Sequence, residues 1–109
     1  MIFAPLYGLY CRGMRKLPKQ IKLKPSTRKD KKWMVVFGFE KPFTVHFGAK
    51  GYSDYTIHNN DDIKRRYIAR HKVNENWNDP YTAGTLSRWI LWNKKSIRAS
   101  FQDYKERFG

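Results

Sequence analysis

The chain lacks most of the features that mark an enzyme, a membrane protein or a secreted protein. Its single cysteine, Cys11, cannot form an internal disulfide bond, and it leaves no second thiol for a cysteine-based metal site. No run approaches the roughly 18 apolar residues that a membrane-spanning helix needs, and residues 1–10 lack the positive lead of a signal peptide. We therefore expect a protein of a reducing compartment that does not span a membrane.

Acidic residues are also scarce. The 109 residues include 9 acids against 23 lysines and arginines, which gives a formal net charge of +14. An excess of this size in a short chain predicts an anionic partner or an anionic neighbourhood. Asp54, Asp61, Asp62 and Asp79 fall in expected loops and helix starts rather than in a cluster. We therefore expect no metal site, no cofactor, no small-molecule substrate and no enzymatic activity.

Aromatic residues, at 17% of the chain, are the abundant core formers. Large rings bury about 150–250 Å² each, so a few of them can build a core without disulfides. Residues 32–40 and 43–47 are rich in β-branched and aromatic residues and flank a turn at Pro42, which predicts a β-hairpin. Residues 20–24 alternate apolar and charged side chains and are a candidate third strand.

On the second predicted strand, alternate residues should face opposite sides of the sheet. Phe43, Val45 and Phe47 share one face of this strand, and we expect that face to pack on the helices. His46 should then face outward or lie near the sheet edge.

The second half of the chain predicts three helices. The first covers residues 63–73, begins after Asn60 or Asp61, and buries a stripe of residues. That stripe consists of Ile63, Tyr67, Ile68 and His71.

A short second helix around residues 86–92 follows a cap at Thr82 or Thr85, with Arg88 pointing outward. The third helix follows Ser96 and has the clearest amphipathic stripe of the chain. Its members are Ile97, Phe101, Tyr104 and Phe108.

Together these elements predict a small α+β domain over residues 32–109. It consists of a β-hairpin or small three-stranded antiparallel sheet packed on three helices, preceded by an extended basic N-terminal arm over residues 1–31. The loop over residues 48–56 carries two glycines without the Gly-Lys-Ser/Thr signature of a phosphate loop. We expect the glycines to shape turns and Tyr52 and Tyr55 to cap the core.

The first ten residues of the arm are apolar and aromatic. They either pack on the domain itself or dock on a neighbouring subunit, and docking is favoured because together they would form a large exposed apolar patch. The docking residues are Ile2, Phe3, Leu6, Tyr7, Leu9 and Tyr10.

Residues 12–32 are basic, and Pro18 and Pro25 exclude a continuous helix there. A basic run can simply be a solvated face, but its density and single sign favour contact with an anion or nucleic acid. The first predicted helix adds a second basic surface. The candidate contacts are Arg12, Arg15, Lys16, Lys19, Lys22, Lys24, Arg28, Lys29, Lys31, Lys32, Lys64, Arg65, Arg66 and Arg70.

Residues 24–28, 44–56, 70–71, 75–80 and 82–94 together resemble a family of small basic proteins of unknown function encoded by large DNA viruses of algae and protists. The resemblance covers roughly residues 22–108. It implies a viral gene product with a structural role in the virion. The shared loop from Ser53 to Thr56 is then either a binding feature or a scaffold of loop hydrogen bonds.

These observations predict a minor capsid or internal capsid-associated protein of a large icosahedral virus, made in the host cytoplasm or nucleus. Its expected partners are capsid or other virion proteins, with an acidic membrane surface as a further contact. The alternative is a sequence-nonspecific DNA-binding or genome-packaging protein.

Overall fold

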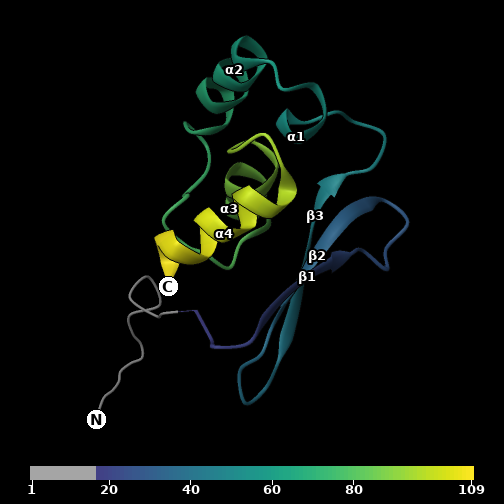
Figure 1. The fold of residues 1–109 in the computed structure, drawn as a ribbon, viewed down its shortest axis with the longest axis vertical. Coiled ribbons are helices and arrows are strands. Elements are labelled where there is room, and N and C mark those ends of the chain that lie inside the picture. The colour runs from purple at the N-terminus through teal and green to yellow at the C-terminus, as the bar shows by residue number, and fades with distance from the viewer. Residues whose placement is uncertain (1–16) are drawn as a thin grey trace.

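The three-dimensional structure of the chain is a computed structural model that describes residues 17–109 (Figure 1). Several predicted contact residues lie outside this described range. They are the docking residues Ile2, Phe3, Leu6, Tyr7, Leu9 and Tyr10 and the cations Arg12, Arg15 and Lys16.

Three antiparallel strands form one sheet in the order β1-β2-β3. They are β1 (Ile21–Pro25), β2 (Lys31–Phe37) and β3 (Phe43–Ala49). The predicted hairpin is confirmed, and the candidate strand around residues 20–24 completes the sheet. Because β1 pairs along its length with β2, the sheet begins before the predicted domain start at residue 32.

The register of the sheet confirms the prediction that alternate residues face opposite sides. Leu23 lies opposite Val35, which lies opposite Val45, so this row points toward the helices. Phe47 is fully buried, whereas Phe43 is 36% exposed and stacks on the ring of Phe37 at 5.0 Å.

His46 belongs to the opposite set of β3 side chains. Its Nδ1 lies 2.7 Å from Ser26 Oγ, in the turn after β1, so the ring is tied to the edge of the sheet.

Four α-helices and one π-helical turn cover the rest of the described chain. They are α1 (Tyr55–His58), α2 (Asp61–His71), α3 (Ala83–Leu86), the π-helix η2 (Ser87–Leu91) and α4 (Ile97–Phe108). The structure is therefore the predicted α+β fold. It has one helix, α1, that the sequence did not predict, and the second predicted helix is divided into α3 and η2.

Local capping explains where the helices begin. Asn60 accepts hydrogen bonds from the backbone N–H groups of Asp62 and Ile63 at the start of α2. Thr82 caps α3 and Ser96 caps α4 in the same way. Each cap satisfies backbone donors that have no partner within the helix.

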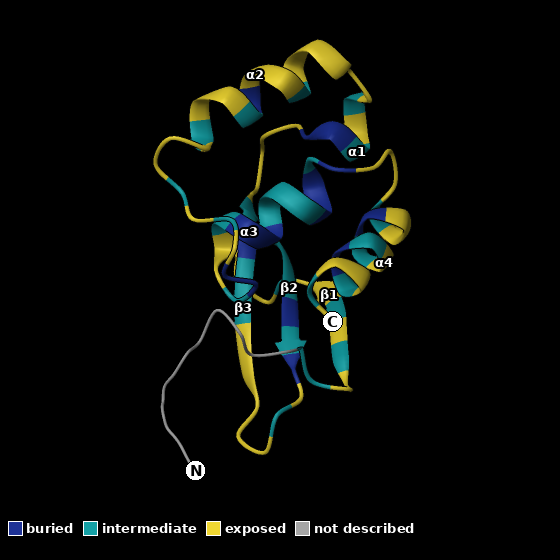
Figure 2. Cartoon of the chain, turned by 90° about the vertical axis from the view of Figure 1, so that its left-hand side faces the viewer, coloured by how far each residue is buried: buried dark blue, intermediate teal, exposed yellow. Residues whose placement is uncertain are grey.

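The core lies where the sheet meets α3, η2 and α4 (Figure 2). It consists of Val35, Phe37, Phe47, Leu86, Ile90, Leu91 and Tyr104, none of which is more than 2% exposed. The Tyr104 hydroxyl donates a 2.6 Å hydrogen bond to the carbonyl oxygen of Pro80, which satisfies the polar end of this buried ring.

Three packing expectations are wrong. Tyr52 does not cap the core, because 73% of it is exposed, and Ile63 is 37% exposed although it was assigned to a buried stripe. Arg88 does not point outward: its guanidinium carbon lies 4.0 Å from the Trp89 ring centroid, and Nη1 donates to the Trp92 carbonyl oxygen at 2.8 Å. Burial lowers the pKa of the Arg88 guanidinium.

Candidate functional site

The predicted basic contacts that the structure describes are spread over several elements. Lys22 and Lys24 are exposed on β1, and Lys19 is exposed just before it. Arg28 and Lys29 are exposed in the turn that follows, where Arg28 pairs with Asp30 at 3.1 Å. Lys31, at the start of β2, is half-buried.

Two of the predicted contacts are engaged inside the fold. Lys32 Nζ lies 2.7 Å from Asp54 Oδ2, and its side chain is only 15% exposed. Lys64 Nζ donates to the carbonyl oxygen of Asn93 at 2.6 Å and lies 4.6 Å from the ring centroid of Tyr55. Burial lowers the pKa of Lys64. Neither lysine is therefore a free surface cation.

Helix α2 carries the remaining candidates. Arg65 pairs with Asp62 one turn earlier, and Arg66 also lies on the exposed face. These residues, with Ala69, line a shallow hollow of about 460 Å³. Arg70 is exposed on the same helix and forms no ion pair with any described residue.

A cavity of about 470 Å³ lies where the β3–α1 loop, α2 and η2 meet. The end of β3 contributes Gly48 and Ala49, the loop contributes Tyr52, Ser53 and Asp54, and β2 contributes Lys32. Helix α2 and the segment around η2 contribute Tyr67, Arg70, His71, Ser87, Leu91 and Trp92. The cavity thus joins the glycine loop to the basic helix, two segments that the sequence analysis treated separately.

The Lys32–Asp54 pair fixes the loop side of the cavity. Asp54 is 2% exposed and is the N-cap of α1, where one carboxylate oxygen accepts from the backbone N–H of Thr56 at 2.9 Å and from its hydroxyl. The other oxygen accepts from Lys32. The carboxylate is therefore fully used by the protein, and the loop of Ser53 to Thr56 is a hydrogen-bonded scaffold at this point.

Gly48 brings the end of β3 close to η2. Its φ of +79° is a backbone conformation that favours glycine, and a Cβ at this position would lie 2.8 Å from Leu91 Cδ1. This contact between β3 and η2 forms one wall of the cavity.

A column of aromatic rings forms the opposite wall. Trp92 and Tyr67 stack at 4.2 Å with 6° between their planes, and Tyr67 and His71 stack at 4.2 Å with 25° between theirs. Tyr67 is the one residue of α2 that is buried. The column therefore both lines the cavity and attaches α2 to the core.

The hydroxyl of Tyr67 has no hydrogen-bond partner among the described residues, although the residue is only 9% exposed. Three other side-chain atoms in the described chain are fully enclosed without a partner: His58 Nε2, Arg88 Nε and Trp89 Nε1. Tyr67 Oη is not enclosed in this way, so a molecule in the cavity can reach it. Burial raises the pKa of Tyr67 to about 12.

His71 is oriented by an acidic partner. Its Nδ1 lies 2.6 Å from Glu75 Oε2, while the other oxygen of Glu75 accepts from Trp77 Nε1 at 3.2 Å. A carboxylate at Nδ1 favours the tautomer with the proton on that nitrogen, which leaves Nε2 as an acceptor when the ring is neutral.

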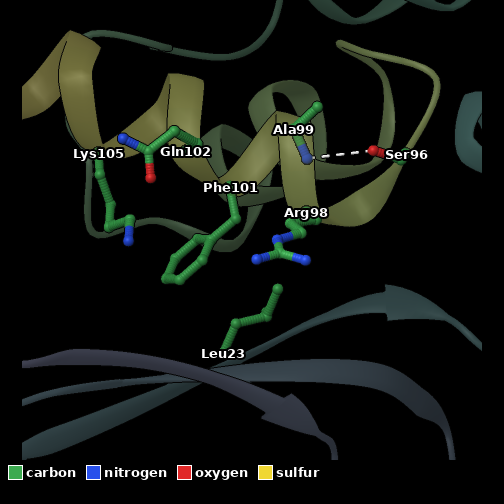
Figure 3. A pocket seen from close by; sticks show the side chains of 7 residues that line it. All are labelled: Leu23, Ser96, Arg98, Ala99, Phe101, Gln102 and Lys105. Atoms are coloured by element: carbon green, nitrogen blue, oxygen red, sulfur yellow. Dashed lines mark hydrogen bonds between the residues drawn. The ribbon is translucent and has the colours of Figure 1, made fainter.

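A second hollow, of about 670 Å³, lies between β1 and α4. Figure 3 shows Leu23 projecting from β1 toward Phe101 and Arg98 of α4. Lys105 Nζ lies 4.8 Å from the Phe101 ring centroid and adds positive charge to the rim. This hollow has an apolar floor, and none of the described residues that line it carries a carboxylate.

Two further properties of the described residues bear on other functions. No group of three or more histidine, cysteine or acidic residues lies close enough to hold a metal ion in residues 17–109. Within that same range, none of the helices combines the length and the apolar character that crossing a bilayer requires.

Residues 21–71 match a family described as a family of unknown function (DUF5754). The matched span runs from the start of β1 to the end of α2, so it contains the sheet, the glycine loop and the α2 side of the cavity. Ser87, Leu91 and Trp92 on the η2 side lie beyond it. The comparisons with curated proteins and with solved structures found no match.

Sequence reasoning identified Arg70 and the glycine loop but not their proximity. The predicted buried stripe included Tyr67 and His71, and the stacking of Tyr67 on His71 and on Trp92 bears that out in part. The available signal was Asp54, because aspartate is one of the residues preferred at the N-cap of a helix. That cap would have indicated α1 and the turn that brings the loop toward α2.

Proposed function

We propose that this protein is a structural component of a virus particle, a minor capsid or internal capsid-associated protein of a large icosahedral DNA virus. In this role its N-terminal arm contacts neighbouring capsid or other virion proteins, and its positive charge lies against acidic surfaces of the particle. These surfaces include acidic protein faces, the packaged genome and acidic lipid. The proposal follows from the resemblance to the viral family and from the charge of the chain.

The distribution of unpaired positive charge is the observation that carries this proposal. Within residues 17–109, only four lysines and arginines form ion pairs with carboxylates: Arg28, Lys32, Arg65 and Arg107. The unpaired cations occur on α2, at one end of the molecule, and on β1 and α4, which lie beside each other away from that end (Figure 1). Charge on several faces suits a protein surrounded by anionic neighbours better than one that binds a single anionic ligand along one groove.

Sequence-nonspecific DNA binding is the alternative, and the exposed face of α2 favours it. Arg65, Arg66 and Arg70 all lie on one short helix, where they could neutralise neighbouring phosphates. Each phosphate contact adds about one unit to the slope of log affinity against log salt. A DNA-binding role therefore predicts a steep salt dependence.

The experiment that separates the two roles is fractionation of gently opened virus particles over a salt series. Retention of the protein with the capsid shell through high salt supports the structural role. Release with the genome, or elution at moderate salt, supports the DNA-binding role instead. Absence of the protein from purified particles contradicts both.

The contribution of the arm is tested by deleting residues 1–16, which leaves β1 and the rest of the sheet intact. The expected result is loss of incorporation into particles while the isolated protein keeps its thermal unfolding midpoint. A matched control replaces Arg12, Arg15 and Lys16 by glutamine and keeps the apolar residues. Normal incorporation of the deletion variant would contradict contact through the arm.

A further inference from the structure

We propose that the cavity between the β3–α1 loop, α2 and η2 binds a nucleotide, with Arg70 contacting the phosphate and the apolar side of the cavity contacting the base. This inference depends on the geometry of the cavity and goes beyond the proposed role in a particle. The nucleotide can be free or can be the terminal nucleotide of a nucleic acid strand. The two sources share one recognition chemistry, and the experiment below distinguishes them.

The charge of the lining selects an anion. Among the described residues that line the cavity, Lys32 is paired with the one carboxylate, Asp54, whereas Arg70 has no acidic partner. Both oxygens of that carboxylate already accept hydrogen bonds from the protein. The uncompensated charge is therefore positive, and Arg70 presents a planar group of donors that suits phosphate oxygens.

The hydrogen-bonding groups of the lining also select an acceptor-rich ligand. The hydroxyls of Ser53, Ser87 and Tyr67 and the indole N–H of Trp92 can all donate, and none of the four donates to a described residue. Tyr67 is the most informative, because the residue is only 9% exposed and its hydroxyl has no partner among the described residues, so a ligand or water in the cavity is needed to satisfy it. A phosphate ester supplies several acceptor oxygens at once.

The size and the apolar wall of the cavity favour a ligand that is larger than a bare phosphate. About 470 Å³ is within the usual range of small-molecule sites. Leu91 provides apolar surface, and so does the ring of Tyr52, which stacks on no described ring, whereas both faces of Tyr67 are already covered by Trp92 and His71. Aromatic side chains accept bases of any sequence, because every base has a π-face. Phosphate at the basic side and a base against the apolar side together describe a nucleotide.

The π-helical turn η2 is a further indication of a site. It places Leu91 and Trp92 on the cavity, whereas a regular helix would carry both residues to a different angle around the axis. Turns of this kind occur frequently at functional sites.

Isothermal titration of the full-length protein with AMP tests the inference, with adenosine and inorganic phosphate titrated in parallel. We expect AMP to bind at least about tenfold more tightly than either fragment, since only AMP fills both sides of the cavity. Binding of inorganic phosphate as tightly as AMP, or no binding of AMP at millimolar concentration, would overturn the inference.

Two variants locate the binding to this cavity. Arg70→Gln should weaken AMP binding by about tenfold or more, and Tyr67→Phe by about threefold to tenfold, because each removes one hydrogen bond to a charged group. Tyr67→Phe keeps the ring stack and Arg70 is exposed, so neither change should unfold the protein, which circular dichroism checks.

Lys72→Gln is the matched control. It removes the same charge from an exposed position two residues after Arg70 that does not line the cavity. We expect its effect on AMP affinity to remain below about twofold, because an exposed charge that does not contact the ligand is screened by salt. If Lys72→Gln weakened AMP binding as much as Arg70→Gln does, the net positive charge of the protein would account for the binding, and the proposed site would be contradicted.

A final pair of titrations separates the two sources of the nucleotide. A short single-stranded oligonucleotide with a 5′-phosphate is compared with the same strand lacking it. Tighter binding of the phosphorylated strand, lost in Arg70→Gln, assigns the site to a strand end. Binding of AMP with no difference between the two strands assigns it to free nucleotide.

Discussion

The molecule is held together differently in its two halves. Around the sheet, α3, η2 and α4, the core consists of fully buried apolar side chains and one hydrogen-bonded tyrosine. The α1–α2 region, by contrast, is attached by the Tyr67–Trp92 ring stack and by hydrogen bonds such as Lys64 to the Asn93 carbonyl. The first half therefore supplies stability, while the cavity lies where the second half meets it.

This contrast has a consequence for dynamics. A helix with one buried residue and many exposed cations should open locally at a lower free energy than the core, because few apolar contacts oppose its release. Ligand-binding elements are commonly drawn from such regions. The position of the cavity at the edge of the stable core is consistent with that rule.

The largest expected effect is in the core. Leu86→Ala removes a fully buried side chain, and we expect it to lower the free energy of unfolding by about 2–5 kcal/mol. Ile63→Ala is the control on α2, where the side chain is 37% exposed and the expected loss is below about 1 kcal/mol. Urea denaturation measures both, and equal losses would contradict the division into two regions.

The next effect is at the junction of the two regions. Asp54→Ala removes the cap of α1 and leaves Lys32 without its counter-ion, so we expect a loss of about 3 kcal/mol. Adding Lys32→Met should recover part of this loss, because it removes the uncompensated charge. Urea denaturation of both variants checks this. A double variant less stable than Asp54→Ala would show that the isolated lysine is not the cause.

The smallest expected effect depends on pH. Burial raises the pKa of Tyr67 to about 12, so the folded protein keeps this proton at a pH at which the unfolded chain, with a tyrosine pKa near 10, has lost it. The stability that this provides is complete below pH 10 and is lost as pH rises toward 12, by up to about 2 kcal/mol.

Thermal melts between pH 9 and pH 12 measure this decline. Tyr67→Phe should decline less steeply than the unmodified protein over that range. Burial also raises the pKa of Tyr104, and its contribution remains in both proteins. Identical pH profiles would contradict the assignment to Tyr67.

Local rules predicted the parts of the fold that depend on neighbouring residues. The caps at Asn60 and Ser96 and the alternation on β3 each need only a few residues of context. The errors arose where packing at long range decides the outcome. Ile63 fits the helical stripe of α2, but only the turn carrying Tyr67 reaches the core, so Ile63 remains exposed.

The candidate cavity could be predicted only in part for the same reason. Its residues are distributed from β2 to the end of η2, and no short motif connects them. The sequence identifies Arg70 as basic and Gly48 as a turn former, whereas the ring column on Tyr67 depends on how α2 approaches Trp92. The missed helix α1 is only four residues long, so its apolar periodicity is too short to detect.

Gly48 has a consequence for how this protein can change over evolutionary time. A substitution there is opposed twice, first by the backbone conformation and again by the methyl group of Leu91. No single mutation relieves both, because shortening residue 91 would still leave the strained backbone. Because Gly48 of β3 contacts Leu91 of η2, the substitutions that each of these two segments can accept depend on the residue present in the other.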